Sequence, residues 1–326
     1  MEAKNVKIAD ATQGFLDGYF STCRRSAKTR SAYRTDLAQL VEHLGAELAL
    51  SDVSAEVLEE WAIELRSHEY HSVSIRRKFA TARVFFAYWI RKGAIGSSPL
   101  WKIRLDLGRE RFLPRCLAAS DAKHLIEAAW AVLQVSDQPV TAPRDARFLH
   151  VRNLAAVEVL FATGIRVGEL VSLNTKDWRE DDASFVINGK GSRQRLAFLP
   201  DDRSQRAMRL YCASRRGIGA DNEALFLNAA GGRLSTQGVA RMVTQYAKTA
   251  GIMVKVTPHM IRHTLATLLL RFGADIRVVQ EVLGHASIAT TQRYTHVSKE
   301  HMLSTLRARH PNHHLNIETT PMKLAS

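Results

Sequence analysis

The sequence predicts a mainly α-helical protein of two domains, with one small antiparallel sheet in the second domain. The chain of 326 residues exceeds a typical single domain of roughly 100–200 residues. Apolar residues recur at helical spacing through most of its length. Only residues 184–199 alternate like two strands around a turn. We expect an N-terminal domain over 1–107, a linker over 108–113, a second domain over 114–310 and a polar tail over 311–326.

The composition excludes several classes of protein. Hydrophobic residues make up 46% and charged residues 24%, as in folded globular proteins. No apolar run approaches the ~18 residues of a membrane span, and the first residues, MEAKNVKIAD, contain no secretory signal. Cys23, Cys116 and Cys212 are far apart and odd in number, which argues against a disulfide framework or a cysteine zinc site. We expect a soluble protein of the cytoplasm.

The charge favours a polyanionic partner. Lys and Arg number 46 against 32 Asp and Glu, which gives a net charge of +14 and a pI near 10.0. Residues 1–108 carry 16 basic against 13 acidic residues, whereas residues 109–326 carry 30 against 19. The usual polyanion in a cell is nucleic acid, so chemistry on DNA or RNA is expected in the second domain. The alternative is a protein that is merely basic.

The N-terminal domain is predicted to be a compact bundle of four helices. Apolar spacing and stop or cap residues such as Gly45 and Gly93 place these helices at 12–20, 31–44, from Asp52 or Ser54 to 65, and 74–89. Basic residues gather near the second and fourth of them. They form either a solvated face or contacts to phosphate groups.

The second domain is predicted to be helical around one hairpin. A helix begins at Ser120, and the proline-containing stretch 134–147 is expected to be a long surface loop. The strands 184–187 and 193–199 flank the turn NGKGS. The remaining helices are expected at 151–161, 203–214, 235–250, 258–272, 276–283 and 299–308.

Four segments carry the candidate chemistry: ATGIRVGEL (162–170), INGKGSRQR (187–195), TPHMIRHTLATLLL (257–270) and LGHASIATTQRYTH (283–296). In order and spacing they resemble the catalytic domain of the tyrosine site-specific recombinases, the phage integrase family, and most closely its bacterial Xer-type members. The resemblance is strong over about 150–310 and looser in the N-terminal bundle. It implies a SAM-like core-binding N-terminal domain, and a DNA strand transferase that works without a metal or another cofactor.

Arg166 and Arg262 are the candidate phosphate-binding residues. The transition state of phosphodiester cleavage concentrates negative charge on two non-bridging oxygens, and fixed cations stabilise it. The planar guanidinium makes bidentate contacts to phosphate and stays charged. Glu169, three residues after Arg166, is predicted to orient that guanidinium and not to react itself.

Tyr294 is the candidate nucleophile. It lies in the polar stretch TTQRYTH, and not on the apolar stripe of a core tyrosine. Its pKa would ordinarily be near 10, so neighbouring cations and a proton acceptor must activate it. The resemblance assigns Lys190, at the glycine-flanked hairpin tip, as general acid for the leaving 5′ oxygen. Arg193 and Arg195 on the following strand are predicted to be backbone contacts only.

The resemblance also assigns the histidines. His259 and His285 are expected to hydrogen-bond non-bridging oxygens, with His259 accepting the proton of the nucleophile. His263 is interpreted as a structural hydrogen-bonding residue. A metal site formed by His259, His263 and His285 is an alternative, although no carboxylate or cysteine lies at ligand spacing.

The family pattern implies double-stranded DNA with a specific recombination site as partner, clamped between the two domains. It implies a tetrameric homo-oligomer on two sites, with a paralogous recombinase or accessory protein as a further partner. The expected reaction serves dimer resolution, integration or mobile-element recombination. The alternatives are a type IB topoisomerase-like nicking-closing enzyme and a catalytically inactive DNA-binding regulator. The apolar stripe of helix 299–308 is expected to dock on a neighbouring protomer or to pack on its own domain.

Overall fold

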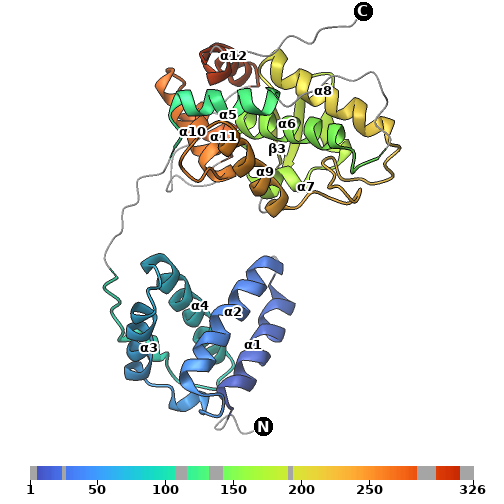
Figure 1. Cartoon of the computed structure of the whole chain (residues 1–326). Helices are drawn as coiled ribbons and strands as arrows, with labels where there is room; N and C mark the ends of the chain where they lie inside the picture. Colours follow the sequence, from blue (N-terminus) through green and yellow to red (C-terminus); the bar gives the residue numbers. More distant parts are fainter. Residues whose placement is uncertain are drawn as a thin grey trace, which may run out of the picture. The chain divides into compact units, whose positions relative to one another are not determined.

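The computed structural model divides the chain into two compact units, Met1–Phe112 and Leu113–Ser326. It describes residues 6–23, 27–107, 116–131, 142–189, 194–284 and 299–315. The proposed linker 108–113 lies outside these residues, as does most of the stretch 134–147. Each unit has a hydrophobic core of its own, formed by separate sets of buried residues. The α-helices of both units and β3 are labelled in Figure 1.

The described part of the N-terminal unit is a helical bundle, as predicted. Its elements are α1 (Ile8–Thr22), α2 (Ala27–Leu44), η2 (Leu50–Asp52), α3 (Ala55–Ser67), α4 (Ser72–Arg91) and η3 (Pro99–Trp101). α1 packs against α2 and α4. Ser54 caps α3 by accepting a hydrogen bond from the Val57 amide at 3.4 Å, which settles the choice between Asp52 and Ser54.

Large aromatic residues fill the core of this bundle. Phe15, Trp61, Phe79 and Phe85 are all at most 2% exposed. A buried carboxylate also joins two of the helices. Asp36 of α2 is 1% exposed and accepts hydrogen bonds from Arg77 at 2.5 Å and from Thr81 at 2.9 Å, both on α4. The buried charge is therefore paired and fixes α2 against α4.

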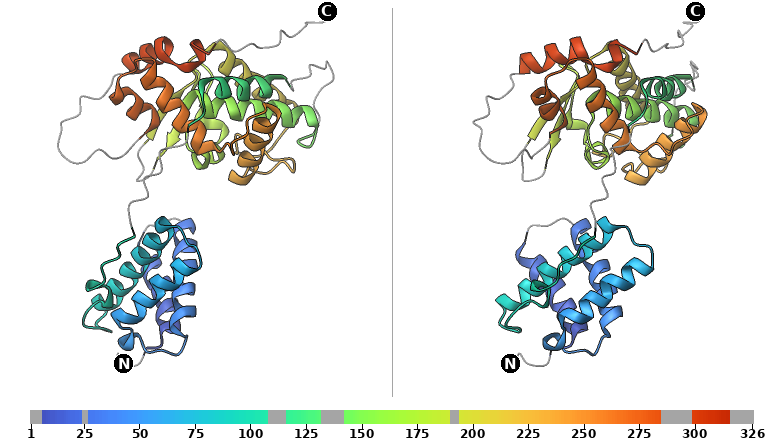
Figure 2. Two further views of the ribbon diagram at one scale, coloured as in Figure 1. Left: turned by 60° about the vertical axis from the view of Figure 1, so that its left-hand side comes forward. Right: turned by 90° about the vertical axis from the view of Figure 1, so that its left-hand side faces the viewer.

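The C-terminal unit is mostly helical with a small sheet. Its described elements are α5 (Ala119–Ala131), α6 (Ala146–Thr163), α7 (Val167–Ser172), η4 (Thr175–Asp177), β1 (Trp178–Arg179), β2 (Ser184–Asn188), β3 (Gln194–Phe198), α8 (Asp202–Gly217), α9 (Thr236–Thr249), α10 (Pro258–Arg271), α11 (Ile276–Leu283), α12 (Lys299–Arg309) and η5 (Pro311–His313). α6 lies among α5, α8, α9 and α10, as the views in Figures 1 and 2 agree. Its residues are buried on nearly every side, as expected of a central helix.

The sheet has the antiparallel order β1-β2-β3. β2 and β3 form the predicted hairpin, in which Ile187 pairs with Arg195 and Phe185 with Ala197. β1 is an additional strand of two residues that the sequence pattern did not predict. It is too short to show an alternating pattern.

The apolar stripe of α12 packs on its own domain in the structure of the single chain. Met302 and Leu306 are 8% and 2% exposed and belong to one cluster with residues of α10 and α11. The chain after α12 is held as well. His310 is fully buried, its Nε2 donates to the Ala162 carbonyl at 2.9 Å, and its Nδ1 accepts from the Asn312 amide at 3.1 Å. Of the two expected positions for this helix, the structure shows packing within the chain.

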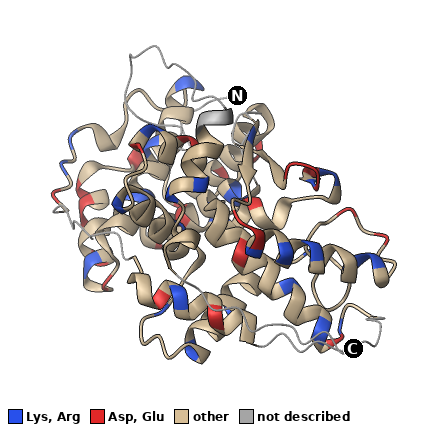
Figure 3. Cartoon of the chain, turned by 90° about the horizontal axis from the view of Figure 1, so that it is seen from above, with Lys and Arg blue, Asp and Glu red and all other residues tan. Residues whose placement is uncertain are grey.

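Basic and acidic positions are mixed along most of the described helices (Figure 3). α4 is an exception, because it contains five Lys or Arg residues and no Asp or Glu. Among the helices that the structure describes, none combines the length and apolar character needed to cross a membrane.

Candidate active site

The structure describes part of the predicted site. Arg166 and Glu169 lie around the start of α7, and Arg262, His259 and His263 lie on α10. Lys190, His285 and Tyr294 lie outside the described residues, as does Arg193. The described part of the site thus consists of the arginines, Glu169 and the ends of the elements that flank the remaining residues.

The turn between α6 and α7 places Arg166. α6 ends at Gly164, whose φ of +60° is the left-handed conformation that glycine adopts without strain. Arg166 follows in an extended conformation as the N-cap residue of α7. Its backbone amide donates to Glu169 Oε2 at 2.9 Å, and its Nη1 donates to Glu169 Oε1 at 2.9 Å. The predicted orienting role of Glu169 thus has a matching geometry in the structure.

A second arginine binds the same carboxylate. Arg195 of β3 donates from Nη1 to Glu169 Oε1 at 3.2 Å and from Nη2 to Oε2 at 2.8 Å. The side chain of Arg195 is 12% exposed, and its contact with Glu169 is one that the expectation of a DNA-backbone contact did not include. The signal was present in the hairpin: Arg195 is paired with Ile187, which is 1% exposed, and directly opposed residues share a face of the sheet.

The pKa of Glu169 reflects this environment. Burial alone would raise the pKa, but the hydrogen bonds and positive charges of Arg195 and Arg166 outweigh it and hold the pKa below the ordinary value. Glu169 is consequently ionised at neutral pH, and it acts as an acceptor and not as a proton donor.

Arg262 lies deeper in the unit and is only 5% exposed. Its Nη1 donates to the Gly164 carbonyl at 2.5 Å, and its Nη2 donates to the Leu283 carbonyl at 2.7 Å. Burial lowers its pKa to about 10, with the positive charges of Arg166 and Arg195 acting in the same direction against Glu169. Arg262 therefore remains protonated at neutral pH and ties the end of α6 to the end of α11.

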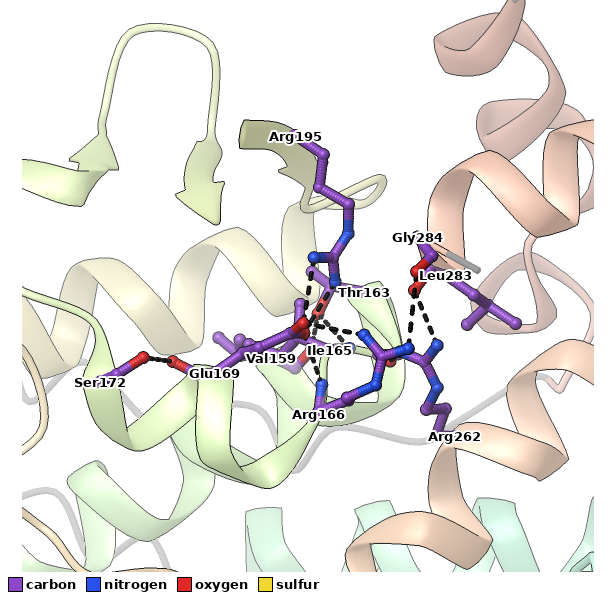
Figure 4. A network of polar contacts seen from close by, with 11 residues as sticks. Val159, Thr163, Ile165, Arg166, Glu169, Ser172, Arg195, Arg262, Leu283 and Gly284 are labelled. Carbon is purple, nitrogen blue, oxygen red and sulfur yellow. Dashed lines mark hydrogen bonds and ion pairs between the residues drawn. The ribbon is translucent and has the colours of Figure 1, made fainter. Parts of the chain in front are cut away.

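Arg166 and Arg195 bind Glu169, and Arg262 lies beside them with a hydrogen bond to the end of α11 (Figure 4). Arg166 Nη2 completes the group by donating to the Gly284 carbonyl at 3.5 Å. Because the cluster contains three guanidinium groups and one carboxylate, it retains an excess of positive charge. Arg166 is the more open of the two predicted phosphate-binding residues, with 42% of its side chain exposed. This arrangement suits an oxyanion such as a phosphodiester.

His259 and His263 are exposed residues of α10. Thr257 caps this helix by accepting from the Met260 amide at 3.2 Å, so His259 lies in its first turn. His259 lies three residues before Arg262 and four before His263 on α10, so it shares a face of the helix with both of them. Among the described residues, no group of three His, Cys, Asp or Glu side chains is arranged to hold a metal ion. The alternative histidine metal site includes His285 and so extends beyond the described residues.

Comparison with known proteins identifies two family matches. Residues 134–301 match the model of the phage integrase family, and residues 12–93 match that of the phage integrase N-terminal SAM-like domain. Tyrosine recombinase XerC of Roseiflexus castenholzii is 37% identical over 298 residues, which cover 89% of this chain and 90% of the relative. Tyrosine recombinase XerD of Bradyrhizobium diazoefficiens is 32% identical and covers 94% of this chain and 98% of the relative.

Solved structures share the fold at lower sequence identity. The XerH site-specific recombinase bound to its palindromic difH substrate superposes with a TM-score of 0.66 at 19% identity, covering 94% of this chain and 81% of that one. A lambda integrase fragment, solved as a dimer bound to a core site, gives a TM-score of 0.66 at 16% identity, covering 90% of this chain and all of the fragment. The mostly helical two-domain fold predicted from the sequence is confirmed.

Proposed function

The chain belongs to the phage integrase family of tyrosine recombinases, enzymes that cut and rejoin DNA, and we propose that it recombines specific DNA sites through a 3′-phosphotyrosyl intermediate formed by Tyr294. Its XerC and XerD relatives align over nearly their whole length. This favours a recombinase over a type IB topoisomerase-like enzyme and over a regulator that has lost catalysis.

The convergence of Arg166, Arg195 and Arg262 around Glu169 carries the proposal. A phosphodiester in cleavage carries growing negative charge on its non-bridging oxygens, and guanidinium groups held in advance stabilise that charge without rearranging. Glu169 holds Arg166 at 2.9 Å, and the carbonyls of Gly164 and Leu283 hold Arg262. The two arginines predicted from the sequence therefore lie in one cluster, although they are 96 positions apart in the chain.

The remaining roles follow the family pattern. The Tyr294 oxygen attacks the phosphorus and forms the P–O bond to the enzyme, while the bond to the 5′ oxygen breaks. His259 accepts the phenolic proton, Lys190 gives a proton to the leaving 5′ oxygen, and His285 hydrogen-bonds a non-bridging oxygen. In the second half of the reaction, a 5′-hydroxyl of the partner strand attacks the phosphotyrosine and releases Tyr294.

The described residues on either side of Tyr294 support a position of this residue near the arginine cluster. Arg166 and Arg262 donate to the carbonyls of Gly284 and Leu283, which immediately precede His285. The chain resumes in α12, which packs on the same domain. Both ends of the segment 285–298 are thus attached to the C-terminal unit that contains the arginines.

The N-terminal unit is proposed to hold the DNA as part of a clamp. α4 exposes Arg76 and Arg83 and lacks acidic residues, and both line an open cavity of about 610 Å³ together with Arg104 and the acidic Asp106. This favours phosphate contacts over a merely solvated face. We propose a tetramer on two DNA sites in the cytoplasm, for dimer resolution, integration or mobile-element recombination.

A nicked suicide substrate tests the proposal. The wild-type chain should form a covalent protein–DNA adduct that resists denaturing electrophoresis. Tyr294→Phe should bind the same DNA with unchanged affinity and form no adduct, because only the phenolic oxygen reacts. Tyr70→Phe, a hydroxyl removal in the N-terminal unit, is the matched control and should retain the adduct. An undiminished adduct with Tyr294→Phe would end the assignment.

A further inference from the structure

Arg195 has a more specific position than a residue that contacts only the DNA backbone. It lies on β3 opposite buried Ile187, and its side chain is 12% exposed. Both terminal nitrogens donate to Glu169, at 3.2 and 2.8 Å. The parallel pair of hydrogen bonds is the strong bidentate form of an arginine–carboxylate contact.

Together, Arg166 and Arg195 occupy the whole acceptor capacity of Glu169. Oε1 accepts from Arg166 Nη1 and from Arg195 Nη1, while Oε2 accepts from the Arg166 amide and from Arg195 Nη2. A carboxylate has about four lone-pair sites, and all four have a donor here. Glu169 is therefore fixed in one orientation, and Arg166 is fixed with it.

Arg195 also packs against Gly284, whose carbonyl is a further acceptor of Arg166. Gly284, whose carbonyl accepts from Arg166 Nη2, has a φ of +63°. A Cβ at this position would lie 2.7 Å from Arg195 Nε and 2.8 Å from its Cδ. The Arg195 side chain thus lies against the backbone of Gly284, directly before His285.

The charges of the three side chains explain why a second arginine is needed. Glu169 with Arg166 alone forms a neutral pair, which attracts a phosphate weakly. With Arg195 added, the carboxylate is neutralised from the other side and one positive charge remains for the substrate. Arg262 does not neutralise Glu169 in this way, because its two terminal nitrogens donate to the carbonyls of Gly164 and Leu283 and not to that carboxylate.

We propose that Arg195 is a positioning residue for Arg166: it neutralises and orients Glu169, so that the Arg166 guanidinium keeps its charge for the scissile phosphate. This inference rests on the proposed function. It also links β3, the strand that follows the hairpin turn with Lys190, directly to the phosphate-binding cluster.

The test compares two substrates that differ only in charge at the scissile position. One carries the ordinary phosphate and the other a methylphosphonate, in which a neutral methyl group replaces a charged oxygen. Arg195→Met should cleave the phosphate substrate about 10- to 100-fold more slowly than the wild type at saturating DNA. On the methylphosphonate, its rate should lie within about threefold of the wild-type rate on that substrate, because less charge then needs stabilisation. The dissociation constant for DNA should not change.

Two further variants make the result specific. Arg195→Lys keeps the charge but loses the bidentate geometry, so it should recover part of the rate on the phosphate substrate; it also serves if the methionine variant does not fold. Arg233→Met is the matched control. Arg233 donates to the carbonyls of Val171 and Leu173 and does not contact Glu169, so its effect should be equal on both substrates.

The outcomes separate the two proposals. Equal slowing of Arg195→Met on both substrates, or a loss of DNA affinity that accounts for the slower cleavage, would overturn the positioning role. An unchanged rate would overturn it as well. Absence of cleavage by the wild-type chain on its own recombination site would instead contradict the proposed function.

Discussion

Gly164→Ala tests whether the close packing at the end of α6 holds the arginine cluster together. Gly164 has a φ of +60°, and a Cβ there would lie 2.7 Å from Leu283 Cδ2 and 2.8 Å from Leu265 Cδ2. Both leucines are buried, at 2% and 0% exposure, so neither can move freely. The substitution thus combines backbone strain with overpacking.

The two costs can be separated with a second glycine. A left-handed conformation costs an alanine about 1–2 kcal/mol, and overpacking of a filled core adds about 1–3 kcal/mol. Gly219 has a φ of +59° but open space around its Cβ. Gly219→Ala should therefore lower the free energy of unfolding only by the cost of the left-handed conformation. Gly164→Ala should lower it by the sum of both costs, about 2–5 kcal/mol.

Thermal unfolding of the two variants measures the difference. For a unit of this size, 1 kcal/mol shifts the Tm by about 2–4 °C, so Gly164→Ala should melt about 2–12 °C below Gly219→Ala. It should also form less covalent adduct, because Leu283 and Gly164 supply the carbonyls that hold Arg262. Equal losses of stability in the two variants would refute the argument that the Gly164 site is tightly packed.

Three other predictions follow from the same structure and sequence. Lys190→Ala should cripple cleavage of ordinary DNA but recover partly when sulfur replaces the bridging 5′ oxygen, because a thiolate leaves without a proton; equal loss on both substrates would contradict a general acid. DNA affinity should fall about 10³–10⁵-fold between 50 and 200 mM salt if ~6–10 phosphates are contacted, and a nearly flat titration would contradict the clamp. Burial lowers the pKa of His310 to about 4, so the unfolded chain binds a proton that the native chain does not. The free energy of unfolding should thus have its full value above pH 6.5 and decrease as the pH falls toward 4, by up to about 1.4 kcal/mol per pH unit. Chemical denaturation of His310→Gln should show a flatter pH dependence than the wild type, and identical pH dependences would contradict the buried neutral histidine.

Local signals predicted the elements that depend on local interactions. Ser54 acts as an N-cap, α10 begins at Pro258 as expected, and the hairpin of β2 and β3 forms where the alternating pattern indicates it. The ends of helices were less predictable. α6 begins at Ala146, five residues before the predicted start, because Asp145 caps it by accepting from the Arg147 amide at 2.8 Å. The nearby prolines had suggested a longer loop.

The motifs located the arginines but not what holds them. The pairing of Glu169 with Arg195 joins residues 26 positions apart, and it depends on which face of β3 turns inward. The Nη atoms of Arg262 donate to the carbonyls of Gly164 and Leu283. Since every residue has a backbone carbonyl, a residue pattern does not indicate which carbonyls act as acceptors. The left-handed conformations of Gly164 and Gly284 were needed to bring those carbonyls into place.

The structure also separates two arginines that the sequence treats alike. Both were predicted as phosphate contacts, yet Arg166 is 42% exposed in its side chain whereas Arg262 is buried. A guanidinium has five N–H donors, so Arg262 can hold two carbonyls and still present donors to a phosphate. In this structure, the hydrogen bonds of Arg262 join α10 to the end of α6 and to the end of α11. Loss of Arg262 should therefore disturb the position of Gly284 and His285 as well as the charge of the site, whereas loss of Arg166 should act mainly on the charge.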